Sequence, residues 1–69
     1  MKYAVVYEQA PRNRAAYVPD LPGDGATGAT RAEVARLVRE GIRLHLEAVR
    51  ESGEPIPEPT TGVELVEIA

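Results

Sequence analysis

Residues 31–52 carry apolar side chains at the spacing of an amphipathic helix. One stripe of this helix consists of Val34, Leu37, Val38, Gly41, Ile42, His45, Ala48 and Val49. The opposite side is charged. Thr30 and Glu33 have the T-x-x-E spacing of a capping box, in which each side chain satisfies a free backbone N–H at the helix start. Gly53 is typical of the position directly after the last turn. The pattern therefore predicts a helix over residues 31–52.

Before this helix, the sequence predicts three short strands. Residues 2–9 are rich in β-branched and aromatic residues and alternate partially. One face of this first strand carries Tyr3, Val5 and Tyr7. Residues 15–18 are predicted as the second strand, and the short connection favours an antiparallel hairpin. Residues 25–28 lie between turn-forming residues and are predicted as a third strand.

After the helix, the chain has a proline-rich segment and then a second apolar run. Residues 54–59 read "EPIPEP" and are expected to form a stiff, extended connection. Residues 62–69 are predicted to be the last strand. Its alternation is imperfect, because apolar residues fall on both faces, which indicates a bulge or a strand covered on both sides. The first face carries Val63 and Leu65, and the second carries Val66 and Ile68.

The predicted fold is α+β, in the order β-β-β-α-β, with one helix packed on one face of an antiparallel sheet. Residues 1–69 form a single domain. A helix of 22 residues is about 33 Å long, whereas a sheet of four strands is only about 15 Å across. The helix should therefore overhang the sheet and need another cover, which predicts a homodimer or a higher homo-oligomer. The residues expected at this interface are Val34, His45, Ala48 and Val49.

Length and charge narrow the possible functions. A chain of 69 residues buries a thin core, and with no cysteine it has no disulfide to stabilise it. Eight basic and eleven acidic residues give a net charge of −3, which argues against direct DNA binding and suits a basic protein partner. Ordinary acidic solubility explains the same charge. No apolar run has the length of a membrane span or a signal peptide, so we expect no membrane association and a cytoplasmic location.

Three glycines match the G-x-G-x-x-G spacing of dinucleotide-binding loops: Gly23, Gly25 and Gly28. In such a site the helix begins at the motif and an acidic residue follows at the end of a second parallel strand. Here the predicted helix begins only after Thr30, and the acid at that distance, Glu47, lies inside the helix. We therefore interpret these glycines as turn residues, and no cofactor is expected.

The remaining candidates for chemistry are few. His45 is the only histidine and lies on the apolar stripe, where a packed core or interface residue is more common than a catalyst. At an interface between copies it would make assembly pH-sensitive. One histidine without cysteine gives no metal-ligand set. The acidic residues Glu8, Asp20 and Asp24 are typical of solvated positions, two of them on turns. We expect no enzymatic activity and no catalytic, cofactor or metal residue.

Several stretches of the chain together resemble the HicB family of type II toxin–antitoxin systems. They are "MKYAVV", "AYVPDLPG", "ATG" with a following threonine, "LHLE" and "GEPIPEP". The resemblance implies a partial ribonuclease-H-like fold with three antiparallel strands, a helix and a further strand. It also implies a partner, the HicA toxin, a small basic ribonuclease that cleaves messenger RNA and whose catalytic surface the antitoxin covers.

The sequence departs from this family in two respects. Many members add a carboxy-terminal DNA-binding domain, whereas the present sequence ends at Ala69, so we expect no direct DNA binding. Members often carry a cysteine where this chain has Asp24.

We predict an antitoxin that contacts the toxin through Tyr17, Asp20 and Asp24. A solitary homo-oligomer with another regulatory or scaffold role is the alternative, and a vestigial metal-dependent nuclease is a third reading that the acidic residues do not favour.

Overall fold

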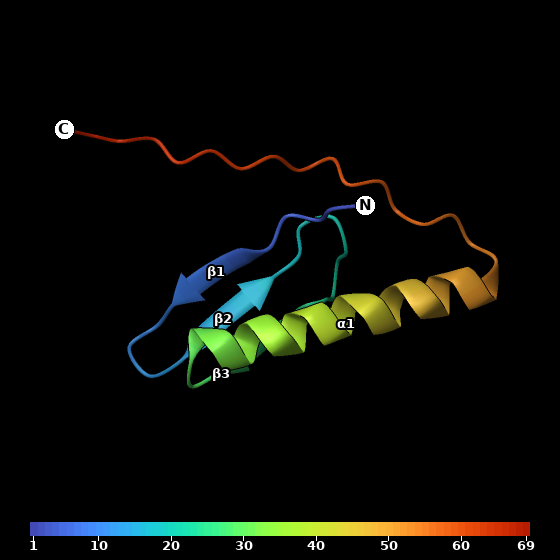
Figure 1. Cartoon of the computed structure of the whole chain (residues 1–69), viewed down its shortest axis with the longest axis horizontal. Helices are drawn as coiled ribbons and strands as arrows, with labels where there is room; N and C mark the ends of the chain where they lie inside the picture. The colour runs from blue at the N-terminus through green and yellow to red at the C-terminus, as the bar shows by residue number, and fades with distance from the viewer.

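The computed structural model describes residues 1–69 and contains three strands followed by one helix. The elements are β1 (Val6–Gln9), β2 (Arg14–Tyr17), β3 (Gly25–Gly28) and α1 (Arg31–Ser52). The strands form one antiparallel sheet in the order β1-β2-β3, and α1 packs along one face of it (Figure 1). The fold class is therefore α+β, as the sequence predicts.

The strands pair in a simple register. Val6 of β1 lies opposite Tyr17 of β2, and Tyr17 in turn lies opposite Gly25 of β3. The first strand begins at Val6 rather than at residue 2. Val6 pairs with Tyr17, the last residue of β2, and the residues before Val6 would have to pair with those after Tyr17. Pro19 lies there and has no N–H to donate, so the ladder ends. Both β1 and β3 are edge strands, since each pairs only with β2.

A small apolar core lies between the sheet and the first half of α1. Its buried residues are Ala16, Val18, Leu21, Val34 and Val38. Partly buried side chains packed against it are Tyr3, Val5, Tyr7, Ala26, Ile42 and Leu46. The face of the first strand that carries Tyr3, Val5 and Tyr7 is thus the one that packs on the core, and Val34, Val38 and Ile42 of the helical stripe do the same. Leu37, in contrast, is partly exposed, so the stripe is narrower than predicted.

The ends of α1 agree with the local signals. The backbone N–H of Glu33 donates to Thr30 Oγ1 over 3.2 Å, and Gly53 adopts a left-handed conformation with φ of 80°. The N–H of Gly53 donates to the Arg50 carbonyl, which satisfies a free acceptor of the last turn. On the exposed face, Arg43 forms ion pairs with Glu40 and Glu47.

The three glycines of the G-x-G-x-x-G stretch have structural roles. Gly23 turns the loop with φ of 92°. A Cβ at Gly25 would lie 2.8 Å from the Ala16 carbonyl, so only glycine fits the pairing with β2 without a shift. A Cβ at Gly28 would meet the Glu33 side chain and Val34. Only Gly23 is therefore a turn residue as predicted, whereas Gly25 and Gly28 are the first and last residues of β3.

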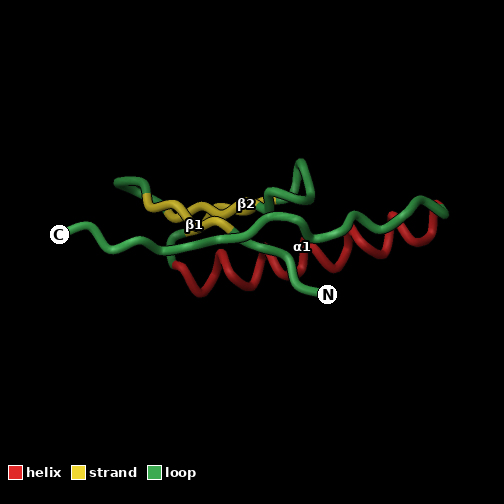
Figure 2. The backbone as a smooth tube through the Cα atoms, turned by 90° about the horizontal axis from the view of Figure 1, so that it is seen from above, coloured by secondary structure: helices red, strands yellow, loops and turns green.

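The predicted fourth strand does not form. Residues 54–69 follow α1 as an extended segment that returns along the side of the sheet where β1 lies (Figures 1 and 2). Residues 63–69 are exposed throughout and have no ladder to β1. The segment is instead held before Gly62, by the Tyr3 hydroxyl at Pro57 and by Asp20 at Thr60 and Thr61, and the residues that follow contact no strand.

Candidate functional site

The loop between β2 and β3 holds two of the predicted contact residues in fixed positions. Val18 and Leu21 of this loop are buried in the core. The N–H of Val18 donates to the Asp24 carbonyl, and the N–H of Asp24 donates to the Leu21 carbonyl. Because the loop is anchored by its buried apolar side chains and by its own hydrogen bonds, the backbone positions of Asp20 and Asp24 are fixed.

Asp24 reaches across to the second half of α1 and meets His45. The Asp24 Oδ2 atom lies 2.9 Å from Nδ1 of His45, with 15% of the Asp24 side chain and 28% of the His45 side chain exposed. This distance is that of an ion pair, yet Oδ2 is buried and no N–H is aimed at it in hydrogen-bond geometry. We therefore describe a close contact between the carboxylate and the imidazole, without a hydrogen bond, at an oxygen that is shielded from solvent. His45 thus lies at the edge of the core beside an acid.

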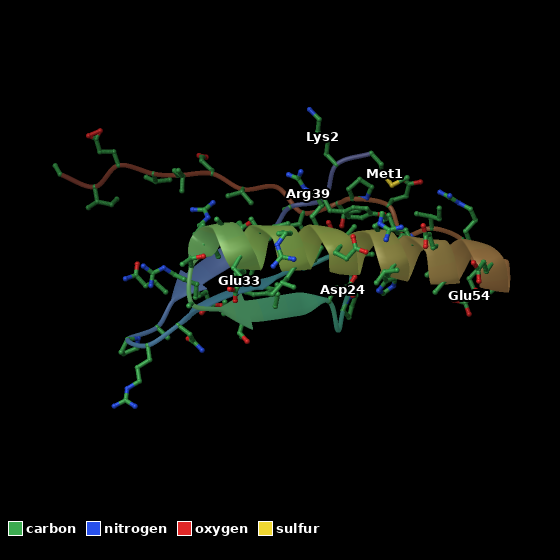
Figure 3. All side chains as sticks on the ribbon, turned by 60° about the horizontal axis from the view of Figure 1, so that its bottom comes forward. Met1, Lys2, Asp24, Glu33, Arg39 and Glu54 are labelled. Carbon is green, nitrogen blue, oxygen red and sulfur yellow. The ribbon has the colours of Figure 1, made fainter.

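This pair lies in a shallow hollow beside the second half of α1. The hollow has a volume of about 520 Å³ and is lined by Asp24, Gly41, Leu44, His45, Ala48, Val49, Ser52 and Glu54. Leu44 is about half exposed there and gives the hollow an apolar wall. Figure 3 shows Asp24 beneath α1 and Glu54 beyond its carboxyl end. Four of the predicted site residues are thus brought together: Asp24, His45, Ala48 and Val49.

Charge gives this hollow a preference for cations. Asp24 and Glu54 are both acidic, and the carboxyl end of α1 at Ser52 adds the partial negative charge of the helix dipole. An apolar wall beside two carboxylates suits a lysine or arginine side chain, whose alkyl stem packs while its charged end is neutralised.

Asp20 does not belong to this hollow. Its carboxylate accepts four hydrogen bonds from the backbone N–H and hydroxyl groups of Thr60 and Thr61, at 2.8 to 3.1 Å. These bonds, first of all the one from the Thr61 N–H, hold the pKa of Asp20 below its ordinary value. In this conformation Asp20 holds the chain's own carboxy-terminal segment, and its predicted contact with a partner stays a prediction.

The other two predicted residues lie elsewhere. Tyr17 is 47% exposed on β2, next in sequence to the buried Ala16, and therefore points to the face of the sheet away from the helix. It remains available to a partner. Val34 is fully buried in the chain's own core. The predicted interface role of Val34 is wrong, because the sheet, and not a second copy, covers the start of α1.

The arrangement presents few groups for chemistry. No group of three or more His, Cys, Asp or Glu side chains is placed to hold a metal ion. The Ser52 hydroxyl, near His45 in the hollow, donates to the Val49 carbonyl at 2.8 Å and is not paired with the imidazole. No helix of the chain combines the length and the apolar character that crossing a membrane requires. The hollow offers a binding surface.

The sequence predicted four residues of this hollow, Asp24 for partner contact and His45, Ala48 and Val49 for an interface between copies, but not the contact at its centre. Asp24 and His45 lie on different elements, and no local pattern links a turn carboxylate to a residue in the middle of a helix. Leu44 and Glu54 were missed altogether. Only their places in the sequence could have indicated these two residues. Leu44 directly precedes His45, and Glu54 directly follows the glycine that ends α1.

Comparison with known proteins gives one informative result. No protein-family model matches the chain, and no curated protein matches it. Among solved structures, a chain of a "HicA3 and HicB3 toxin-antitoxin complex" is similar, with a TM-score of 0.69 and 27% sequence identity. The similarity covers 87% of the present chain and 70% of the other. The protein is therefore similar, in fold and in sequence, to a component of a toxin–antitoxin complex.

Proposed function

We propose that this protein is a HicB-like antitoxin that binds a HicA-type ribonuclease toxin and blocks its messenger-RNA-cleaving surface sterically. The observation that carries the proposal is the similarity over 87% of the chain to a component of a toxin–antitoxin complex. The HicB-like stretches of the sequence favour the antitoxin as the relevant component. The acidic balance of the chain supports the same choice, because the resemblance implies a basic toxin.

The hollow at Asp24 and His45 is the surface that we assign to toxin binding. Asp24 and Glu54 give the hollow negative charge, and Leu44 offers exposed apolar area in the same hollow. A basic side chain of the toxin would meet both features at once. Occlusion requires no chemistry from the antitoxin, only a fixed surface that covers the groups that otherwise bind RNA.

Toxin binding tests the proposal directly. The full chain is mixed with the small basic protein encoded beside its gene, and the dissociation constant is measured by calorimetry. We expect binding, and we expect Asp24→Lys and Leu44→Asp each to weaken it by about tenfold or more, as for residues central to an interface.

Two matched variants make the result specific. Glu8→Lys reverses an exposed charge on β1, outside the hollow, and Leu37→Asp changes a partly exposed leucine two turns earlier in α1. Both should bind nearly as well as the parent chain. If no small basic neighbour binds, or if the control variants weaken binding as much as the hollow variants, the proposal fails.

A solitary homo-oligomer without a toxin is the second candidate. The observation that favours it is the exposed apolar segment after Gly62, which no part of the same chain covers. Self-association alone does not distinguish the two candidates, because the hollow and this segment are different surfaces. Absence of toxin binding together with stable self-association would leave the homo-oligomer alone.

A further inference from the structure

We propose that residues 63–68 of one copy bind as an added strand in the groove between β1 and α1 of a second copy, so that two copies exchange their carboxy-terminal segments. The proposal concerns self-association and goes beyond toxin binding. It uses residues that take no part in the hollow at Asp24 and His45.

The carboxy-terminal segment has the composition of a strand and is left without a cover. Val63, Leu65, Val66 and Ile68 are 68%, 95%, 69% and 83% exposed. Four large apolar side chains within six residues are unusual on the surface of a stable monomer, and an extended β-prone segment of this kind is an aggregation hazard unless it pairs. The segment therefore requires a partner strand.

The start of this segment is fixed, while its end is free. Tyr3 donates a hydrogen bond from its hydroxyl to the Pro57 carbonyl, and Asp20 accepts the four bonds from Thr60 and Thr61. Gly62 follows with nothing within 4 Å of a Cβ built on it. The chain thus leaves its own body at a glycine, which permits a change of direction at this point.

The acceptor is the groove between the amino-terminal strand and the helix. It has a volume of about 500 Å³ and is lined mostly by apolar residues of α1, of β1 and of the segment that precedes β1. They are Met1, Tyr3 and Val5 before β1, Tyr7 in β1, and Ala35, Val38 and Ile42 in α1. Beside it, β1 pairs only with β2, so its other edge has free backbone N–H and C=O groups. An extended segment that adds to such an edge gains main-chain hydrogen bonds and places alternate side chains into the neighbouring groove.

Charge and alternation fit the two parts together. The groove also includes Lys2 and Arg39, which Figure 3 shows on the same side of the molecule as Met1. The segment contains Glu64 and Glu67. As a strand, its first face carries Val63, Leu65 and Glu67, and its second carries Glu64, Val66 and Ile68. Either face would bring two apolar side chains and one carboxylate to an apolar groove with two basic residues.

A second copy is the occupant that the structure favours. The chain's own segment runs along the side of β1 (Figure 2) and yet pairs with nothing beyond Thr61, although the groove is nearby. When two copies related by a two-fold axis exchange residues 63–68, the segment of each copy fills the groove of the other. Both grooves and both segments are then covered by the same type of contact. It also adds buried apolar area to a chain with only five buried residues, which is the usual remedy for a core this small.

Sedimentation equilibrium of the full chain over a wide concentration range, combined with hydrogen exchange at residues 63–68, tests this proposal. We expect a dimer, with amides 63–68 protected only at concentrations where the dimer is populated. Leu65→Asp should weaken dimerisation by about tenfold or more, since it places a charge in the apolar groove. Leu44→Asp changes an exposed leucine of the hollow and should leave dimerisation unchanged.

A mixing experiment keeps the result independent of folding defects. Arg39→Glu and Glu67→Lys each reverse one charge of the proposed contact. Each variant alone should dimerise weakly. An equimolar mixture should form a heterodimer, because the segment made basic by Glu67→Lys then meets the groove made acidic by Arg39→Glu, while the other segment and groove keep their original charges.

Two outcomes would overturn the proposal. Protection of residues 63–68 in a monomer would do so, because the segment would then fill its own groove. Dimerisation that is sensitive to Leu44→Asp and insensitive to Leu65→Asp would do so as well, because the contact between copies would then lie at the hollow.

Discussion

The Asp24 carboxylate lies 2.9 Å from the His45 imidazole and joins the β2–β3 loop to the second half of α1. The contact lies after the buried helix residues Val34 and Val38, between Ile42 and Leu46, which are partly buried against the core. It therefore positions the second half of α1 without enclosing it. The consequence is a surface that is fixed in shape and open to a partner.

Replacing Asp24 should weaken toxin binding strongly while changing the free energy of unfolding only a little. The pair is partly exposed, and such ion pairs contribute between zero and about 1 kcal/mol, so Asp24→Ala should lower the free energy of unfolding by less than about 1 kcal/mol. Toxin affinity should fall by about tenfold or more if Asp24 receives a basic side chain. Urea unfolding and calorimetry on the same sample measure the two effects. A large loss of stability would show that Asp24 acts structurally.

A buried core residue of the β2–β3 loop and a partly exposed residue of the helical stripe should contribute unequally to stability. Leu21→Ala removes a fully buried side chain and should cost about 2 to 5 kcal/mol, enough to unfold much of a small domain. Leu37→Ala removes a side chain that is 38% exposed and should cost clearly less. Chemical denaturation of both variants provides the comparison. Equal losses would mean that Leu37 is buried in solution, for example by a second copy.

Two glycines should respond in opposite directions to alanine. Gly41 lies inside α1 with nothing within 4 Å of an added Cβ, so Gly41→Ala should stabilise the protein by up to about 1 kcal/mol. Gly25→Ala places a Cβ 2.8 Å from the Ala16 carbonyl and should destabilise the pairing of β2 with β3. Thermal unfolding of the two variants checks the sign of each change. A stabilising Gly25→Ala would contradict the described register.

The attachment of the carboxy-terminal segment should depend on pH through Asp20. Hydrogen bonds from Thr61 and Thr60 lower the pKa of this carboxyl from its ordinary 3.8. A carboxyl with a lowered pKa stabilises the folded form above the unfolded value, and this contribution is lost as pH falls through the folded pKa. The amide resonances of Thr60 and Thr61 should thus stay unchanged at neutral pH and shift together only below about pH 3.8.

Asp20→Asn provides the control for this pH effect. The amide cannot accept four hydrogen bonds as a carboxylate does, so the segment should be cleaved faster by protease at neutral pH in this variant than in the parent chain. Cleavage at the parental rate would show that the Asp20 contacts do not hold the segment in solution.

The sequence predicted the local features of this fold well. The helix begins after Thr30 and ends before Gly53 because capping depends on residues within one turn, which a sequence displays directly. The hairpin of β1 and β2 follows from a short connection for the same reason. The pairing of residues 25–28 as a strand is also confirmed.

What the sequence could not reveal depends on contacts between distant residues. Residues 62–69 have strand composition, but a strand exists only where a partner edge accepts it. The bonds of Asp20 to Thr60 and Thr61 join residues 40 and 41 positions apart, and the Asp24–His45 contact joins a loop to a helix. Val34 was placed at an interface because periodicity identifies the buried stripe of a helix without saying which polypeptide covers it.

Inhibition of the toxin is the most direct test of the proposed function. Messenger-RNA cleavage by any small basic protein that a neighbouring gene encodes is measured while the full chain is added in increasing amounts. We predict that cleavage falls to background near equimolar antitoxin, and that the Asp24→Lys variant requires a large excess. Undiminished cleavage with a saturating amount of the parent chain would contradict the proposed function.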